Sequence, residues 1–149
     1  MTRRLNQQAL GTTLLRLVIG IVFIAHGWTK LSSFGVAGTA GFLTSLGVPL
    51  AGVMAPVLIG TEIGGGILLV LGLLTRYAAI PLAFTMAVAI GTVHLQHGFF
   101  LPQGYEFALL VGVGLLTLAL QGSGAFALDN LVFRRTPSAG AVEIERRAA

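Results

Sequence analysis

Long apolar segments make up most of the chain, and short polar or turn-forming stretches separate them. A helix of about 20 apolar residues crosses the hydrocarbon core of a bilayer. Four segments approach or exceed that length, at residues 14–31, 50–74, 77–96 and 105–121. The pattern predicts an all-α fold, an integral membrane four-helix bundle that forms a single transmembrane domain over residues 1–133.

The connections between these segments differ in length. Thr75 and Arg76 leave room for only a tight turn between the second and third segments, which predicts that these two helices are antiparallel neighbours. Residues 32–49 form a longer connection with an apolar face, and it ends in Gly47 and Pro49, which is typical of a helix stop. We expect a short interfacial helix between helices 1 and 2; a glycine-containing loop is the alternative.

Basic residues outside the apolar segments predict the orientation. One side of the predicted topology carries Arg3, Arg4, Arg76, Arg134, Arg135, Arg146 and Arg147, and the other carries only Lys30. The positive-inside rule then predicts that the N and C termini are cytoplasmic. Residues 134–149 are expected to form a basic, disordered cytoplasmic tail, preceded by a short helix for which Asp129 is a candidate N-cap.

Composition agrees with a membrane protein, because 55% of the residues are hydrophobic and 9% are charged. The net charge of +4 follows from the topology, and no nucleic-acid partner is needed to explain it. The chain has no cysteine, which excludes a thiol relay or an iron–sulfur cluster held by its own thiolates. Electrons could therefore pass only through a bound cofactor or a partner protein.

Ionisable side chains inside apolar segments are the main candidates for function, because a charge in the bilayer core is costly and normally has a partner. There are six of them, Arg16, His26, Lys30, Glu62, His94 and Glu106. Arg16 precedes Lys30 by 14 residues and Glu62 follows Leu50 by 12 residues. At a helical rise of 1.5 Å per residue, these separations correspond to similar depths of about 21 and 18 Å. We therefore expect Arg16 and Glu62 to form a structural ion pair.

The remaining ionisable groups fall at the outer ends of the predicted helices. Candidate ligand-binding residues are His26, Lys30, Glu62, His94 and Glu106. At about 100° per residue, Arg16, His26 and Lys30 share one face of the first helix. Lys30 could also simply extend toward the headgroups. No catalytic residue is assigned and no metal site is expected.

Small residues predict where helices approach each other closely. Gly60 and Gly64 form a GxxxG pair around Glu62, and we expect them to lie in such a contact.

Three runs resemble the DoxX family of four-helix bacterial membrane proteins. They are LLRLVIGIVFIAHGWTKL at 14–31, GTEIGGGILLVLGLLTR at 60–76 and YEFALLVGVGLLTLALQGSGAFALD at 105–129. The resemblance marks Arg16, Lys30 and Glu62 as family-like positions and implies a multi-pass protein of the bacterial inner (plasma) membrane. Because relatives include a membrane subunit of a thiosulfate to quinone oxidoreductase, it also implies a membrane subunit of a redox or respiratory system, with quinone as a cofactor or ligand and a redox partner protein.

Several functions fit the same residues. The leading hypothesis is a quinone-linked oxidoreductase subunit that binds a small hydrophobic ligand in the outer half of the bundle. A transporter of a small hydrophobic or weakly acidic solute is one alternative, and a non-catalytic membrane anchor for a soluble enzyme is another. Haem ligation by His26 and His94 is a fourth. A homo-oligomer is compatible with each of them.

Overall fold

The computed structural model of the protein describes residues 7–132, and this part of the chain is helical and contains no strand. Its α-helices are α1 (Gln7–Thr29), α2 (Gly35–Ser45), α3 (Ala51–Leu71), α4 (Thr75–Ala89), α5 (Glu106–Gln121) and α6 (Asp129–Val132). Three continuous helical segments are long and apolar enough to cross a membrane, and α5 is a shorter apolar helix. The predicted all-α membrane bundle is confirmed. The predicted tail over 134–149 lies outside the described residues.

The helix bounds differ from the predicted ones mainly at the ends. α1 begins at Gln7 rather than at residue 14, because the polar residues before the apolar core continue the same helix. Beyond Thr29 the helix continues as a π-helical turn over Lys30–Phe34, and α2 follows directly. α2 is the predicted short helix between the first two long ones. α4 likewise continues as a π-helical turn over Ile90–His94.

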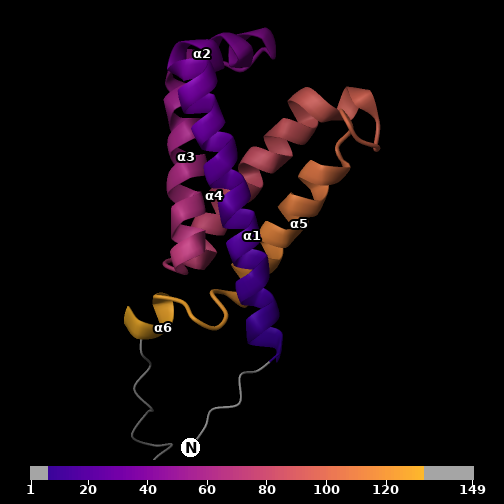
Figure 1. Ribbon diagram of the computed structural model, residues 1–149. Coiled ribbons are helices and arrows are strands. Elements are labelled where there is room, and N and C mark those ends of the chain that lie inside the picture. The colour runs from indigo at the N-terminus through magenta and orange to yellow at the C-terminus, as the bar shows by residue number, and fades with distance from the viewer. Residues whose placement is uncertain (1–6, 133–149) are drawn as a thin grey trace, which may run out of the picture.

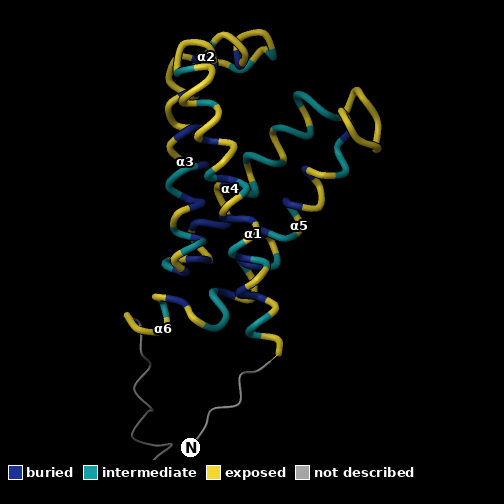
Figure 2. Tube along the Cα trace, in the orientation of Figure 1, coloured by how far each residue is buried: buried dark blue, intermediate teal, exposed yellow. Residues whose placement is uncertain are grey.

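The four long helices form two antiparallel pairs, α1 with α3 and α4 with α5. Figure 1 shows that the pairs lie close together near α6 and diverge toward the end that carries α2. We call the first end the Arg16 end and the second the Lys30 end, after a basic residue of α1 and one of the π-helical turn that extends it. Buried positions concentrate in the lower and middle parts of the bundle, whereas α2 and the α4–α5 loop are mostly exposed (Figure 2).

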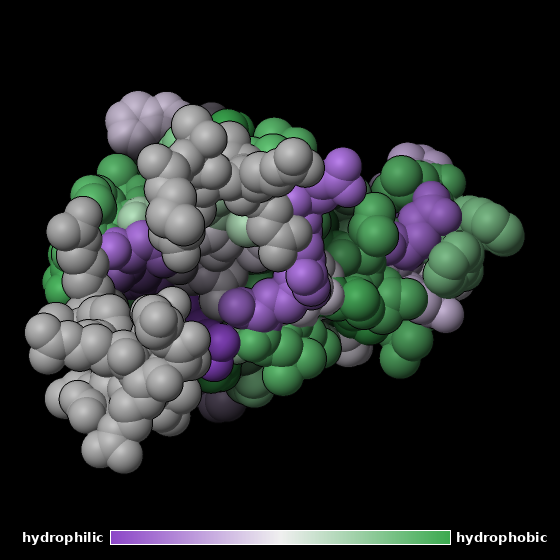
Figure 3. Space-filling view, turned by 90° about the horizontal axis from the view of Figure 1, so that it is seen from below, coloured by the Kyte–Doolittle hydropathy of each residue, from purple (hydrophilic) through white to green (hydrophobic). Residues whose placement is uncertain are grey.

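A single apolar core joins the two pairs. Its fully buried members include Leu69 of α3, Leu82 of α4, and Leu115 and Leu118 of α5. A smaller cluster of Leu43, Ala51 and Ala55 attaches α2 to α3. Seen from the Arg16 end, hydrophilic residues lie near the middle of the visible face, and hydrophobic residues separate them from a second hydrophilic group toward the right (Figure 3). The core therefore fixes the Arg16 end and leaves the Lys30 end more open.

Glycines bring α1 and α3 into direct backbone contact. A Cβ on Gly20 would lie 2.8 Å from the carbonyl oxygen of Gly66, and a Cβ on Gly66 would lie 2.7 Å from the carbonyl oxygen of Gly20. The prediction for Gly60 and Gly64 was wrong, because a Cβ on either would meet nothing within 4 Å. Both lie on the side of α3 that faces away from its helical neighbours, so the four-residue spacing marked the wrong face.

Candidate functional site

Lys30 and Glu62 form a buried salt bridge between the end of α1 and the middle of α3. The Lys30 Nζ lies 2.9 Å from Oε1 and 2.8 Å from Oε2 of Glu62. Gly27 allows this contact, because a Cβ there would already be 3.1 Å from the Cβ of Glu62. The Glu62 side chain is only 4% exposed and that of Lys30 is 24% exposed. The pair therefore neutralises a carboxylate in the apolar interior while its cation remains partly accessible.

The predicted ion pair of Arg16 with Glu62 is wrong. The depth comparison treated Lys30 and Leu50 as the upper ends of their helices, but the helix of Lys30 continues to Phe34. Glu62 therefore lies beside Gly27 rather than beside Arg16. The residue that faces Arg16 is Leu69, seven positions further along α3. At 1.5 Å per residue, these seven positions place Arg16 about 10 Å from Glu62 along the axis of α3.

Arg16 is bound by backbone groups instead. Its Nη1 donates hydrogen bonds to the carbonyl oxygens of Leu69 at 2.6 Å and Val70 at 3.0 Å, and its Nη2 donates to that of Phe126 at 3.3 Å. The first two carbonyls belong to the last turn of α3, where helical carbonyls lack i+4 donors and a cation is favoured by the helix dipole. The Leu69 carbonyl also accepts from the backbone N–H of Gly72 at 3.1 Å. Asp129 adds electrostatic attraction to Arg16. With 1% of its surface exposed, Arg16 is a structural residue of this end.

Further hydrogen bonds close the Arg16 end. The carboxylate of Asp129 accepts from the backbone N–H of Leu74 at 2.7 Å and of Thr75 at 3.3 Å, at the start of α4. Asp129 thus caps α4 in addition to beginning α6, which local sequence could not indicate. Thr13 Oγ1 of α1 hydrogen-bonds to the carbonyl oxygen of Ala125 at 2.7 Å. These contacts tie α1, α3, α4 and the segment after α5 together.

A cavity of about 780 Å³ lies between the two helix pairs at the Lys30 end. Its lining is mostly apolar, and its polar lining residues are His26, Lys30, Thr61, Glu62, Thr85, Thr92 and His94. The structure therefore brings four of the five candidate ligand residues to one cavity. Glu106 is the exception: its Oε1 accepts from the backbone N–H of Leu101 at 2.8 Å and stabilises the α4–α5 loop.

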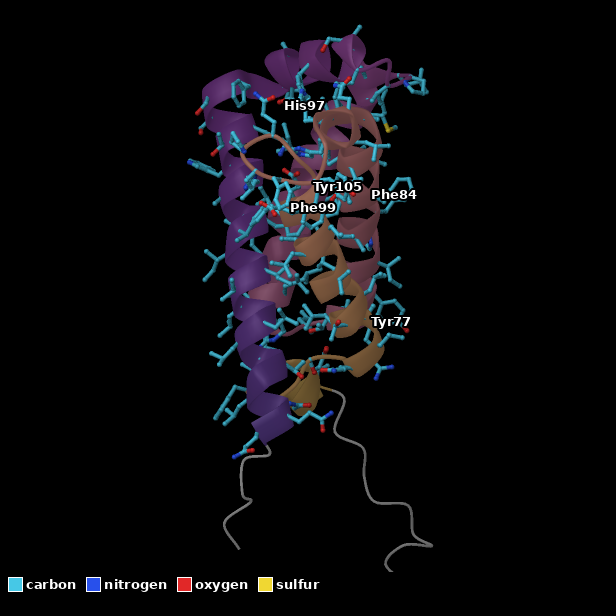
Figure 4. The ribbon with its side chains drawn as sticks, turned by 90° about the vertical axis from the view of Figure 1, so that its right-hand side faces the viewer. Tyr77, Phe84, His97, Phe99 and Tyr105 are labelled. Carbon is cyan, nitrogen blue, oxygen red and sulfur yellow. The ribbon has the colours of Figure 1, made fainter. Side chains whose placement is uncertain are left out.

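Exposed apolar residues border this cavity between α3 and α4. Val57 is 53% exposed and Phe84 is 70% exposed, and both contribute to the cavity lining. In Figure 4, Phe84 points outward from α4. In a membrane protein such a face contacts lipid tails. The cavity thus borders the bilayer interior as well as the polar groups of Lys30 and Glu62.

A second cavity of about 600 Å³ lies between α1 and α2. Four residues line both cavities and lie at the boundary between them: His26, Lys30, Phe42 and Leu58. Phe34 and Thr39 line only the second cavity.

Two π-helical turns present polar residues to the first cavity. One contains Lys30 at its start, and the other, Ile90–His94, contains His94 at its end. π-Helical turns are rare and occur often at functional sites. Gly35 follows the first turn with φ 67°, and Gly98 closes the α4 extension with φ 78°. The similar endings of α1 and α4 are consistent with a shared role at the Lys30 end.

Comparison with known proteins gives a consistent family. The DoxX family matches residues 11–95 of the chain. The chain is 39% identical over 125 residues to "Putative oxidoreductase CatD" of Bacillus subtilis (strain 168), covering 84% of this chain and 89% of that protein. It is 35% identical over 130 residues to "Inner membrane protein YqjF" of Escherichia coli (strain K12), covering 84% and 94%.

A further relative is "Inner membrane protein YphA" of Escherichia coli (strain K12), 30% identical over 124 residues that cover 76% of this chain and 84% of that protein. No solved structure matches the chain. The matched residues include Arg16, Lys30 and Glu62, which form the two buried charge sites described above. The chain is therefore a membrane protein that belongs to the DoxX family.

Proposed function

We propose that the protein is a membrane subunit of a quinone-linked redox or respiratory system and binds a small hydrophobic ligand in the cavity at the Lys30 end. The observation that carries the proposal is the Lys30–Glu62 salt bridge, buried in an apolar bundle and exposed on one side to a cavity of about 780 Å³. Ionisable pairs inside membrane bundles commonly mark ligand or proton sites. The name of the Bacillus subtilis relative, "Putative oxidoreductase CatD", agrees with this chemistry.

The polar groups suit a ligand with oxygen atoms on an otherwise apolar body. A lysine ammonium has three donor hydrogens, and Lys30 places two donations on Glu62. The third hydrogen remains for a ligand oxygen. Glu62 supplies a carboxylate that can hold a proton next to that oxygen, and the apolar walls accommodate a ring and a tail.

The proposed cellular setting is the bacterial inner membrane, which agrees with the names of two relatives. In the proposed orientation both termini are cytoplasmic, and Lys30 faces the opposite side. A redox partner protein would supply or receive the electrons, because the chain has no cysteine with which to hold a thiolate-bound cluster.

Quinone binding by the purified protein tests the proposal. Trp28 is the single tryptophan and lies two residues before Lys30, so its fluorescence provides a local signal for titration with duroquinone. We expect saturable quenching, with the Kd raised about tenfold in Lys30→Ala and Glu62→Gln, as for loss of one charge-assisted hydrogen bond. Glu106→Gln is the matched control, since Glu106 does not line the cavity. Absence of binding, or equal Kd values in all variants, would overturn the proposal.

A transporter is the second candidate function, and one observation favours it. The cavity is accessible at the Lys30 end, while the hydrogen bonds of Arg16 and Asp129 close the opposite end. A binding site open on one side resembles one state of an alternating-access cycle. Solute flux into proteoliposomes containing the purified protein separates the two functions, because a redox subunit binds its ligand without translocating it.

A further inference from the structure

We infer that His94 accepts a hydrogen bond from the ligand, so that the cavity prefers the hydroxyl-bearing form of an aromatic ligand, a hydroquinone, over the corresponding quinone. This inference rests on the proposed function and specifies the chemical form that the same cavity selects. It depends on the hydrogen-bonding state of His94, on its position in the cavity, and on the complementary donor at Lys30.

The hydrogen bond of His94 fixes which ring nitrogen carries the proton. Its Nδ1 lies 2.8 Å from the backbone carbonyl oxygen of Gln103. A carbonyl oxygen only accepts hydrogen bonds, so Nδ1 must donate and therefore carries a hydrogen. In the neutral imidazole the other nitrogen, Nε2, then has a free lone pair. His94 is consequently an acceptor toward any group that approaches Nε2.

The cavity combines this acceptor with a donor on another wall. His94 comes from the extension of α4, whereas Lys30 comes from the extension of α1, and both line the same cavity. A hydroquinone has hydroxyl groups that donate to Nε2 and oxygen atoms that accept from Lys30. A quinone carbonyl brings only lone pairs toward Nε2. A ligand without a hydroxyl forgoes the hydrogen bond to Nε2, which is worth about 1 kcal/mol or more.

His97 provides an internal comparison. Its Nδ1 makes the same type of hydrogen bond, 2.9 Å from the carbonyl oxygen of Val93. His97 does not contribute to the lining of the cavity, and Figure 4 shows it near the tip of the molecule, above Phe99 and Tyr105. The two histidines therefore share a tautomer-fixing contact and differ in access to the ligand.

The test measures anaerobic binding of durohydroquinone, duroquinone and the dimethyl ether of durohydroquinone to the full-length protein in detergent. For the unmodified protein we expect a Kd for durohydroquinone about tenfold lower than for the other two, which lack a hydroxyl donor. His94→Asn keeps an amide donor near the position of Nδ1 for Gln103 but removes Nε2. It should bring the three Kd values together, while His97→Asn should leave the tenfold preference unchanged.

Each outcome decides between the two claims. Equal Kd values in the unmodified protein, or a preference that persists in His94→Asn, would overturn the role of His94 and leave ligand binding in place. Failure of every compound to bind would overturn the proposed function together with this inference. The comparison with the dimethyl ether needs no variant, so equal Kd values in the unmodified protein would overturn the inference even if His94→Asn does not fold.

Discussion

Each end of the bundle holds one basic side chain, Arg16 of α1 or Lys30 of the π-helical turn that follows α1, but the two side chains have different partners. Arg16 donates its hydrogen bonds to backbone carbonyls of α3 and of the segment after α5, and no cavity adjoins it among those described here. Lys30 is paired with a carboxylate, and two cavities adjoin it. The planar guanidinium suits several fixed acceptors, whereas the compact ammonium keeps a donor free. The two cations carry the same charge, so their partners distinguish them: backbone carbonyls for the structural Arg16, and a carboxylate beside a cavity for the ligand-binding Lys30.

Substitution of Arg16 should have the largest effect on stability. Arg16→Ala removes the guanidinium donors of the Leu69, Val70 and Phe126 carbonyls, of which Leu69 keeps only the backbone N–H of Gly72. We expect a loss of about 3 kcal/mol or more in the free energy of unfolding. Thermal unfolding in detergent measures the change. Arg76→Ala is the control, since Arg76 is exposed and makes one long contact of 3.5 Å to the carbonyl oxygen of Gln121. Equal melting temperatures for both variants would contradict a structural role for Arg16.

Removing Lys30 or Glu62 from the salt bridge should lower the free energy of unfolding by different amounts. Lys30→Met leaves the Glu62 carboxylate, 4% exposed, without a counter-charge, and we expect a loss of about 2 kcal/mol. Glu62→Met leaves Lys30, which is 24% exposed and can reach water, so its cost should be near 1 kcal/mol. Urea or thermal unfolding of both single variants and of the double variant measures this. A double variant less stable than Lys30→Met would contradict mutual neutralisation.

The Lys30–Glu62 salt bridge should require the close approach of α1 to α3. Gly27→Ala places a Cβ 2.6 Å from Cγ1 of Ile63 and 3.1 Å from the Cβ of Glu62, so we expect a loss of about 1–2 kcal/mol from overpacking. Gly60→Ala, with nothing within 4 Å, should be neutral or slightly stabilising because alanine favours the helix. Melting temperatures of the two variants provide the measurement; similar losses for both would show that the α1–α3 contact lies elsewhere.

Removal of the Asp129 carboxylate should have the smallest effect. Asp129→Ala leaves the backbone N–H groups of Leu74 and Thr75 without their cap, a change that typically costs about 1 kcal/mol. Ligand affinity should not change, because Asp129 lies at the Arg16 end. A drop in affinity as large as that of Glu62→Gln would show that the two ends are coupled.

The sequence was sufficient for the membrane bundle and for most of the site, but not for the pairing of charges. Apolar segment length identified the long helices. Helical periodicity placed Arg16, His26 and Lys30 on one face; Arg16 is buried and Lys30 is half-buried against Glu62, but His26 is exposed. Predicting the partner of Glu62 required the offset of α1 relative to α3 along the helix axes. The helical extension of α1 to Phe34 and the contact of Gly20 with Gly66 determine that offset.

Other features of the site depended on contacts between distant segments. Asp129 caps α4, although its sequence neighbours suggested only α6. Glu106 accepts a hydrogen bond within the α4–α5 loop, although its position at the end of a helix resembled that of His94. A pattern of residue types along one segment does not contain this information, because each partner lies on another segment or in an irregular loop.

The most direct test of the difference between the two ends measures both ligand affinity and thermal stability in two variants, Lys30→Met and Arg16→Lys. The second variant retains the positive charge. We predict that Lys30→Met raises the Kd for duroquinone about tenfold, whereas Arg16→Lys lowers the melting temperature and leaves the Kd of the folded protein within about twofold of the unmodified value. An equal rise in Kd for both variants would contradict the assignment of ligand binding to the Lys30 end alone.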